Sequence, residues 1–252
     1  MIIEVRGAAL TYQSDNGEVE ALRDISFSLA EGELCSIVGP SGCGKSTLLG
    51  AIAGLETLDR GTILVDGQEV HGPSPKIGLM PQRDQLFEWK TIWDNVTLGL
   101  RVRRQDTPQR REYVALLLQR YGLANFAQKR PNQLSGGMRQ RCALIRTLAT
   151  EPRILLLDEP FSALDYQTRL AVSGDIHAIL RSEGKTALLV THDISEAISM
   201  SDRVIVLSHR PAVVKAIHDL GPLRGLTPME RRSAEQFQPF FHTIWKELDV
   251  HA

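Results

Sequence analysis

Nine consecutive residues, from Gly39 to Thr47, carry the clearest chemistry in the sequence. They match the pattern GxxxxGK[ST] of a phosphate-binding loop, between a run that suits a strand and a run that suits a helix. Glycines let successive backbone N–H groups point at a β-phosphate, which also meets the positive end of the following helix. We expect Lys45 to bridge the β- and γ-phosphates of ATP and the Ser46 hydroxyl to bind Mg²⁺. The residues expected to hold the nucleotide here are Gly39, Pro40, Ser41, Gly42, Cys43, Gly44, Lys45, Ser46 and Thr47.

Two adjacent acids, Asp158 and Glu159, follow a second strand-like run of four apolar residues. A phosphate loop needs a metal-positioning acid at the end of another strand, so we assign Asp158 to Mg²⁺ through water. We assign Glu159 to the water that attacks the γ-phosphate. Neighbouring side chains of a strand point to opposite faces, so both acids reach one site only if the strand ends there. Pro160 is consistent with that ending, although two acids can also simply open a solvated loop.

Short apolar runs bounded by Gly, Pro or Asp alternate with helical stretches, which predicts an α/β fold with a mainly parallel sheet. The run 25–29 alternates as a half-buried strand does, and 63–65 before Asp66-Gly67 suits one arm of a hairpin, so we expect antiparallel sheet near the N-terminus. From 107 to 149 the spacing is helical, with Gly122 as a stop, which predicts an inserted helical lobe over about 83–150. The expected core strands are 34–38, 77–80, 154–157, 187–190 and 204–207.

The composition suits one domain over residues 1–252, with a C-terminal tail from 215 to 252. Lys and Arg total 29 against 30 Asp and Glu, so charge gives no reason to expect a nucleic-acid partner. No apolar run approaches the ~18 residues that span a bilayer, and the first residues do not resemble a secretion signal. We therefore expect a soluble, intracellular protein that reaches a membrane only by docking. The three cysteines have no metal-binding or disulfide spacing.

The stretch from Leu134 to Arg141 resembles the LSGGQ signature of ABC ATPases, with Met138 in place of the signature glutamine. It repeats an anion-binding device, a serine hydroxyl and glycine N–H groups at a helix N-terminus, without a lysine. Because the chain has its own phosphate loop, the resemblance implies that this signature faces the γ-phosphate held by a second copy of the chain. It places four further residues at the nucleotide, namely Ser135, Gly136, Gly137 and Gln140.

Other positions match the same family in order. Tyr12 resembles the aromatic residue that stacks on adenine, and Gln82 resembles the glutamine that touches Mg²⁺ and the attacking water. Asp165 is similar to a residue that contacts the other subunit, and His192 to the histidine that senses the γ-phosphate. Taken alone, this tyrosine suits core packing and this histidine suits a surface or capping position. The family fold is a P-loop NTPase core with an N-terminal antiparallel β-subdomain and an inserted helical subdomain.

The segment from Met80 to Val96 resembles importers of nitrate, sulfonates, taurine and pyrimidine precursors, although Glu88 departs from their pattern. The tail agrees, because it is too short for a regulatory domain and its apolar residues suit one amphipathic helix. The resemblance implies an ATP-hydrolysing subunit that works as a homodimer on transmembrane permease subunits, and indirectly with a solute-binding protein. It would lie at the cytoplasmic face of the cell membrane as a peripheral protein. The apolar tail residues are Phe237, Phe240, Phe241, Ile244, Trp245 and Leu248.

The alternative is a soluble ABC ATPase for cofactor assembly that has no membrane partner. Repair and chromosome types place long coiled coils between the phosphate loop and the signature, but here Lys45 and Ser135 are 90 residues apart. A small-molecule kinase leaves the signature unexplained. Three surface features stay open between a partner and an ordinary structural role: the arginines of 101–111, the pair Trp89 and Trp93 at helical spacing, and the aromatic tail.

Overall fold

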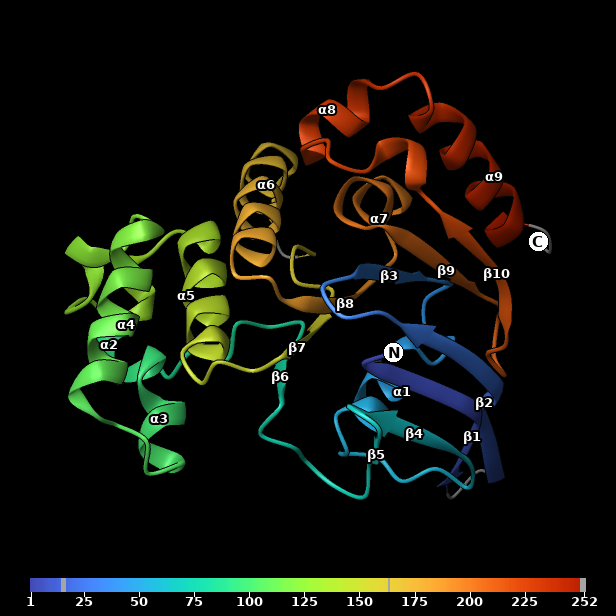
Figure 1. Ribbon diagram of the computed structural model, residues 1–252, viewed down its shortest axis with the longest axis horizontal. Helices are drawn as coiled ribbons and strands as arrows, with labels where there is room; N and C mark the ends of the chain where they lie inside the picture. The colour runs from blue at the N-terminus through green and yellow to red at the C-terminus, as the bar shows by residue number, and fades with distance from the viewer. Residues whose placement is uncertain (15–16, 163, 250–252) are drawn as a thin grey trace.

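The larger of two β-sheets holds the strands that were expected to form the core. The structure, a computed structural model, describes residues 1–14, 17–162 and 164–249 (Figure 1). The sheet has six strands in the order β10-β9-β3-β8-β7-β6, parallel except for the antiparallel edge strand β10. Their bounds are β3 Leu34–Val38, β6 Ile77–Met80, β7 Ile154–Asp158, β8 Thr186–Thr191, β9 Arg203–Leu207 and β10 Val214–Asp219.

Both faces of this sheet are covered, which explains why its central strands are continuous apolar runs. Alternate residues of one strand join different clusters: Ile154 and Leu156 join the cluster shared by α1 (Lys45–Ile52) and the N-terminal sheet, whereas Leu155 and Leu157 join the cluster of the helical lobe and α6 (Tyr166–Ser182). Figure 1 shows α6 and α7 (Ile194–Met200) on the helical side. The sheet is therefore a rigid layer whose strand ends can position a site.

The smaller sheet, in the order β2-β1-β4-β5, is antiparallel and lies near the N-terminus, as predicted (Figure 1). In β2, Ile25, Phe27 and Leu29 are buried while Ser26 between them is exposed, which confirms the expected alternation. The predicted hairpin joins β4 to β5 through Asp66 and Gly67, both with positive φ. The strand bounds are β1 Ile3–Ser14, β2 Gly17–Leu29, β4 Arg60–Val65 and β5 Gln68–Glu69.

A helical lobe connects β6 to β7 and projects from the side of the sheet (Figure 1). The helix α4 of this lobe has clear boundaries. Thr107 accepts a hydrogen bond from Arg110 N at its start, and Gly122, at φ 72°, follows its end. This confirms the predicted stop. The lobe contains α2 Ile92–Val96, α3 Leu98–Val102, α4 Pro108–Arg120, η1 Ala124–Phe126, η2 Pro131–Gln133 and α5 Gly136–Leu148.

The chain after β9 is more than a tail. Residue 215, the expected tail boundary, lies inside β10, and the chain continues through η3 (Gly221–Leu223), α8 (Pro228–Ser233) and α9 (Phe237–Asp249). The tail aromatics do form one amphipathic helix, in which Phe237 and Ile244 are buried against α7 and β9 and Trp245 is exposed. Packing back on the domain, rather than an open partner surface, therefore accounts for most of this helix.

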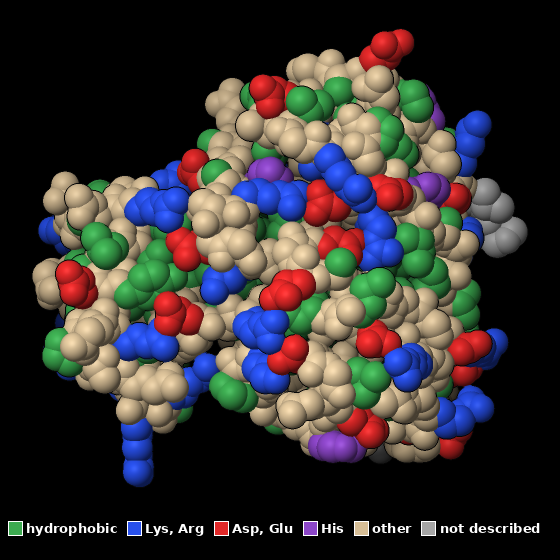
Figure 2. All heavy atoms as spheres, viewed as in Figure 1, with side chains coloured by type: hydrophobic (Ala, Val, Ile, Leu, Met, Phe, Trp, Pro, Cys, Tyr) green, Lys and Arg blue, Asp and Glu red, His purple; other side chains and the backbone are tan. Residues whose placement is uncertain are grey.

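The surface charges, the helix lengths and the cysteines are as the sequence predicts. Figure 2 shows basic side chains interspersed with acidic ones on the face in view, without a large patch of one sign. Across the described residues, no helix combines the length and apolar character needed to cross a membrane. Cys35, Cys43 and Cys142 are free and buried, and burial raises the pKa of Cys142 to about 12, so it packs as a neutral thiol.

Candidate nucleotide-binding site

Four adjacent strands of the large sheet deliver the predicted site residues at their carboxyl ends. β3 leads through the phosphate loop into α1 (Lys45–Ile52), and its neighbour β8 leads to His192. β7 ends at Asp158 and is followed directly by Glu159, and β6 beside it leads to Gln82. Ligands bind outside the carboxyl ends of strands in open α/β sheets, so these residues are gathered where such a site belongs.

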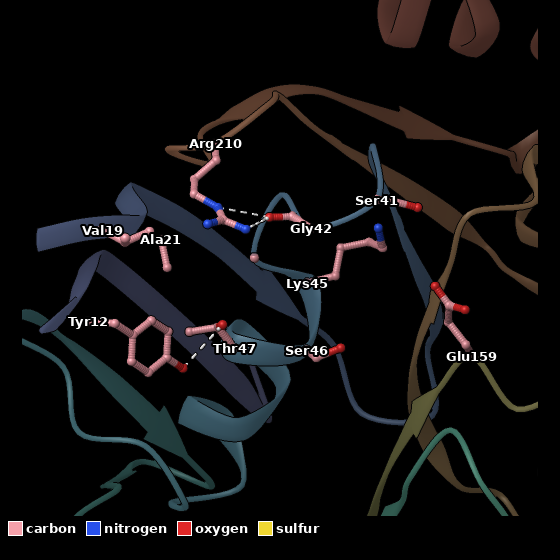
Figure 3. Close-up of a pocket in the computed structure, with 11 residues that line it drawn as sticks. Tyr12, Val19, Ala21, Ser41, Gly42, Lys45, Ser46, Thr47, Glu159 and Arg210 are labelled. Atoms are coloured by element: carbon pink, nitrogen blue, oxygen red, sulfur yellow. Dashed lines mark hydrogen bonds between the residues drawn. The ribbon is translucent and has the colours of Figure 1, made fainter. Parts of the chain in front are cut away.

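The phosphate loop holds the lysine in its interior. Lys45 is buried, and its Nζ donates to the carbonyl oxygens of Gly39 at 2.8 Å and Pro40 at 2.9 Å. Gly44 has φ 119°, and a Cβ there would lie 2.8 Å from the Ala21 carbonyl oxygen, so only glycine fits. The loop lines a cavity of about 240 Å³ (Figure 3), together with the residues Tyr12, Val19, Ala21, Ser41, Gly42, Gly44, Lys45, Ser46, Thr47, Glu159 and Arg210.

The two acids face the same site because the strand ends between them. Asp158 is the last residue of β7, and Glu159 has a left-handed backbone at φ 43°. The Ser46 hydroxyl donates to Asp158 Oδ1 at 3.2 Å, and burial raises the pKa of Asp158. A hydroxyl and a partly desolvated carboxylate are hard oxygen donors that gain from a nearby cation, so this pair fits Mg²⁺.

Glu159 is held by two of the predicted residues. Gln82 Nε2 donates to Glu159 Oε2 at 3.1 Å, and His192 Nδ1 lies 3.2 Å from the same oxygen. Both partners contact the same oxygen of Glu159. The Glu159 carboxylate also lines the cavity (Figure 3). This arrangement can orient a carboxylate to accept a proton from a water molecule between it and a terminal phosphate.

Tyr12 presents its ring at the other end of the cavity. It lies in β1 opposite Val19 of β2, is 38% exposed, and its hydroxyl donates to Thr47 Oγ1 at 3.3 Å (Figure 3). An exposed ring fixed at its polar end provides a flat surface for stacking. The structure thus places Tyr12 at the cavity rather than in the core.

The structure places the signature residues elsewhere, at the start of α5. Ser135 caps the helix by accepting from Met138 N at 3.3 Å, and it is not among the described residues that line the cavity. A Cβ at Gly137 would lie 2.9 Å from Val172 of α6, so this glycine also permits close helix packing. Gln140 is only 3% exposed, so its side chain lies inside the lobe, away from the surface that Ser135 occupies.

Asp165, expected to contact another subunit, caps α6 by accepting from Thr168 N at 3.0 Å. Ala163, two residues before Asp165, lies outside the described residues. Three cavity residues were not anticipated from the sequence: Val19, Ala21 and Arg210. None belongs to a motif, and the alternation predicted for 25–29 does not extend to Val19, which is half-buried, or to Ala21, which is buried.

The two tryptophans have different environments. α2 begins only at Ile92, so Trp89 precedes the helix, is 68% exposed and packs on Phe87 with ring centroids 5.0 Å apart. Trp93 lies within α2 and packs on the lobe core. The helical spacing of the pair was therefore misleading, and only Trp93, which is half-buried, packs against the lobe core.

The arginines of 101–111 form mostly local contacts. Arg101 pairs with Asp94 at 2.6 Å, Arg111 pairs with Asp106 at 2.8 Å, and Arg110 pairs with Glu151. Neighbouring acids thus neutralise much of the cluster, which supports the interpretation as a solvated face.

The fold and the site together define a P-loop ATPase. The family model for the ABC transporter domain matches residues 22–162, and the chain belongs to this family of ATP-binding subunits and hydrolyses ATP. An uncharacterised ABC transporter ATP-binding protein, YtlC of Bacillus subtilis, is 46% identical over 95% of this chain and 92% of its own length.

Two named relatives and one solved structure extend the comparison. The taurine import ATP-binding protein TauB of Ruegeria pomeroyi is 41% identical, covering 83% of this chain and 78% of its own. The nitrate transport protein NasD of Klebsiella oxytoca is 40% identical, covering 84% of this chain and 82% of its own. The dimeric, post-hydrolysis structure of the ATP-binding cassette MJ0796 with ADP and Pi superposes with a TM-score of 0.74 at 32% identity, covering 86% of this chain and 98% of that one.

Proposed function

We propose that this chain is the ATP-hydrolysing subunit of an ABC importer for a small solute, and that two copies enclose each nucleotide. The observation that carries the proposal is the separation of two phosphate-binding devices in one chain. Lys45 lines the cavity, whereas Ser135 caps α5 outside it. A second copy that faces the first would bring its Ser135 to the γ-phosphate bound by Lys45, and the dimeric cassette MJ0796 bound to ADP and Pi supports this arrangement.

Within each site, the chain's own residues divide the work of hydrolysis. Ser46, Asp158 and Gln82 would hold Mg²⁺, which supplies positive charge to the phosphate oxygens. Glu159, oriented by Gln82 and His192 through its Oε2, would orient the attacking water and accept its proton. Lys45 would neutralise charge on the β- and γ-phosphates, and Tyr12 would stack on the adenine.

The similar proteins support an importer function and narrow the class of transported solute. Proteins named for taurine import and nitrate transport are about 40% identical to this chain over most of their length. The solute would be of the nitrate, sulfonate, taurine or pyrimidine-precursor type, delivered by a solute-binding protein. Permease subunits would dock on the helical lobe around exposed Trp89, and the chain would then lie at the cytoplasmic face of the membrane.

The shared site can be tested by size-exclusion chromatography in the Glu159→Gln background, where we expect ATP but not ADP to convert monomers to dimers. Adding Ser135→Arg abolishes this dimer and leaves the ATP affinity of the monomer almost unchanged. Lys45→Ala weakens nucleotide binding in the monomer itself. Ser233→Arg, on the exposed end of α8, is the matched control and keeps the dimer. If Ser135→Arg reduced monomer affinity as severely as Lys45→Ala, the shared site would be refuted.

The solute class has a separate test. The gene for this chain is expected to adjoin genes for a permease and a solute-binding protein. Calorimetric titration of that binding protein with nitrate, taurine, other sulfonates and pyrimidine precursors would identify the solute. Absence of any permease partner in co-purification would favour the soluble ATPase instead.

A further inference from the structure

Arg210 lines the nucleotide cavity but belongs to none of the motifs identified in the sequence (Figure 3). It lies in the turn between β9 and β10, far along the chain from the phosphate loop. Its Nε and Nη2 atoms both donate to the carbonyl oxygen of Gly42, at 3.0 and 2.6 Å. We propose that Arg210 is a positioning residue that fixes the phosphate loop in its nucleotide-binding conformation.

The turn that carries Arg210 is itself firmly held. Ala212 is fully buried, its N–H donates to the Ala21 carbonyl at 3.0 Å, and its carbonyl accepts from Arg23 N at 2.9 Å. The turn is also closed by a bond from Ser208 N to the Val213 carbonyl at 3.0 Å. Arg210 therefore projects from a turn that is fixed to β2. Its planar guanidinium loses little further conformational freedom when Nε and Nη2 both donate to the Gly42 carbonyl, an arrangement called the fork below.

Gly42 is adapted to this contact. Its φ of 73° is left-handed, and a Cβ there would lie 3.2 Å from Arg210 Nη2. Glycine at this position therefore provides both the backbone conformation and the room for the guanidinium. A carbonyl oxygen has two lone pairs, so it can accept both charged donors at once.

The fork also sets the direction of a backbone donor. A peptide bond is planar and trans, so the Gly42 carbonyl and the Cys43 N–H point in opposite directions. The carbonyl faces Arg210, which turns the Cys43 N–H away from that side chain and across the loop, where it donates to the Pro40 carbonyl at 3.2 Å. This bond closes the turn from Pro40 to Cys43, which leads into the backbone N–H groups that a phosphate loop offers to a β-phosphate. Arg210 thus acts on the nucleotide by holding this turn through Gly42.

This mechanism predicts a specific kinetic pattern for Arg210→Ala. The β-phosphate is present in both ATP and ADP, and in this proposal the fork orders the loop before either nucleotide binds and before hydrolysis begins. Loss of the fork is expected to weaken the binding of both nucleotides to the same extent. The expected rise in Kd is about tenfold, which corresponds to about 1.4 kcal/mol. The KM for ATP rises similarly while kcat changes less than about twofold, since uniform binding affects only KM.

The test compares Arg210→Ala with Arg210→Lys and with Arg224→Ala. Lysine supplies one donor in place of a fork and is expected to restore part of the affinity. Arg224 is a matched exposed arginine, paired with Asp219 at 2.9 Å beyond the end of β10. Equilibrium binding uses ADP and a non-hydrolysable ATP analogue. Hydrogen exchange of the peptide covering 39–47, measured without nucleotide, is expected to quicken in Arg210→Ala and to remain normal in Arg224→Ala.

Three results would overturn the proposal. A much larger loss for the ATP analogue than for ADP would mean that Arg210 contacts the γ-phosphate directly. Unchanged affinity and exchange in both Arg210 variants would mean that the fork has no role in binding. A lower melting temperature of Arg210→Lys with a parallel fall in kcat would mean that the residue only supports the fold.

Discussion

Glu196, in the first turn of α7, is a buried acid whose replacement by glutamine is expected to reverse part of the pH dependence of stability. The residue is 4% exposed, and burial, followed by the nearby charge of Asp193, raises its pKa to about 8. Thr191 and the arginines Arg169 and Arg232 act in the opposite direction but more weakly. Glu196 is therefore neutral in the folded protein at mildly acidic pH.

The sign and size of this pH effect on the free energy of unfolding follow from proton linkage. Between its unfolded pKa of 4.5 and its folded pKa of about 8, Glu196 binds more protons in the folded state than in the unfolded state. Its contribution to stability is thus present below the unfolded pKa and is lost as the pH rises through this window. At about 1.36 kcal/mol per pKa unit, the loss between about pH 5 and about pH 8 is roughly 3 kcal/mol.

The assay is urea unfolding of the wild type and of Glu196→Gln without nucleotide, at about pH 5 and about pH 8. Glutamine is neutral at both pH values, so the variant is expected to gain stability relative to the wild type by roughly 3 kcal/mol on going to the higher pH. Glu235→Gln, at an exposed position, is the control and shows no such gain. A pH-independent difference between wild type and Glu196→Gln would refute the reasoning.

Two further predictions concern catalysis and docking. Glu159→Gln is expected to retain ATP binding and to lose turnover by ~10²-fold or more, the scale of a general base, and near-normal phosphate release would assign the base elsewhere. Trp89→Ala is expected to leave the melting temperature and basal ATPase rate nearly intact while reducing co-purification with the permease, because this ring is exposed. Trp93→Ala, which removes a half-buried ring that packs against the lobe core, is the contrasting variant and is expected to lower the melting temperature. Unfolding of Trp89→Ala would contradict the docking role.

Sequence reasoning succeeded where the determining interactions are local. The alternation of 25–29 reports one buried face, and the phosphate loop combines a strand, glycines and a helix within a short stretch. The two acids could be assigned to one site because a proline follows them and a strand end was the only geometry that served both. The structure confirms that ending, with Glu159 in a left-handed conformation.

The remaining features depend on contacts between distant segments. Arg210 reaches the cavity because Ala212 bonds to β2, a pairing that no local pattern reveals. Spacing suggested one helical face for Trp89 and Trp93, but the cap at Thr91 starts α2 between them. The expected boundary of the C-terminal tail, residue 215, falls inside β10, because main-chain bonds to β9 make the first residues of this segment an edge strand.

The position of the helical lobe has a consequence for how such proteins diversify. β6 and β7 are parallel neighbours in the sheet, and two parallel strands can be joined only by a crossover that returns to the same end. The lobe is that crossover in enlarged form. Its helices can therefore be lengthened, shortened or resurfaced without changing the register of any strand pair, and the strand ends that carry Gln82 and Glu159 stay in place. If permease subunits dock on this lobe as proposed, one ATPase core can be fitted to different partners by altering a single connection.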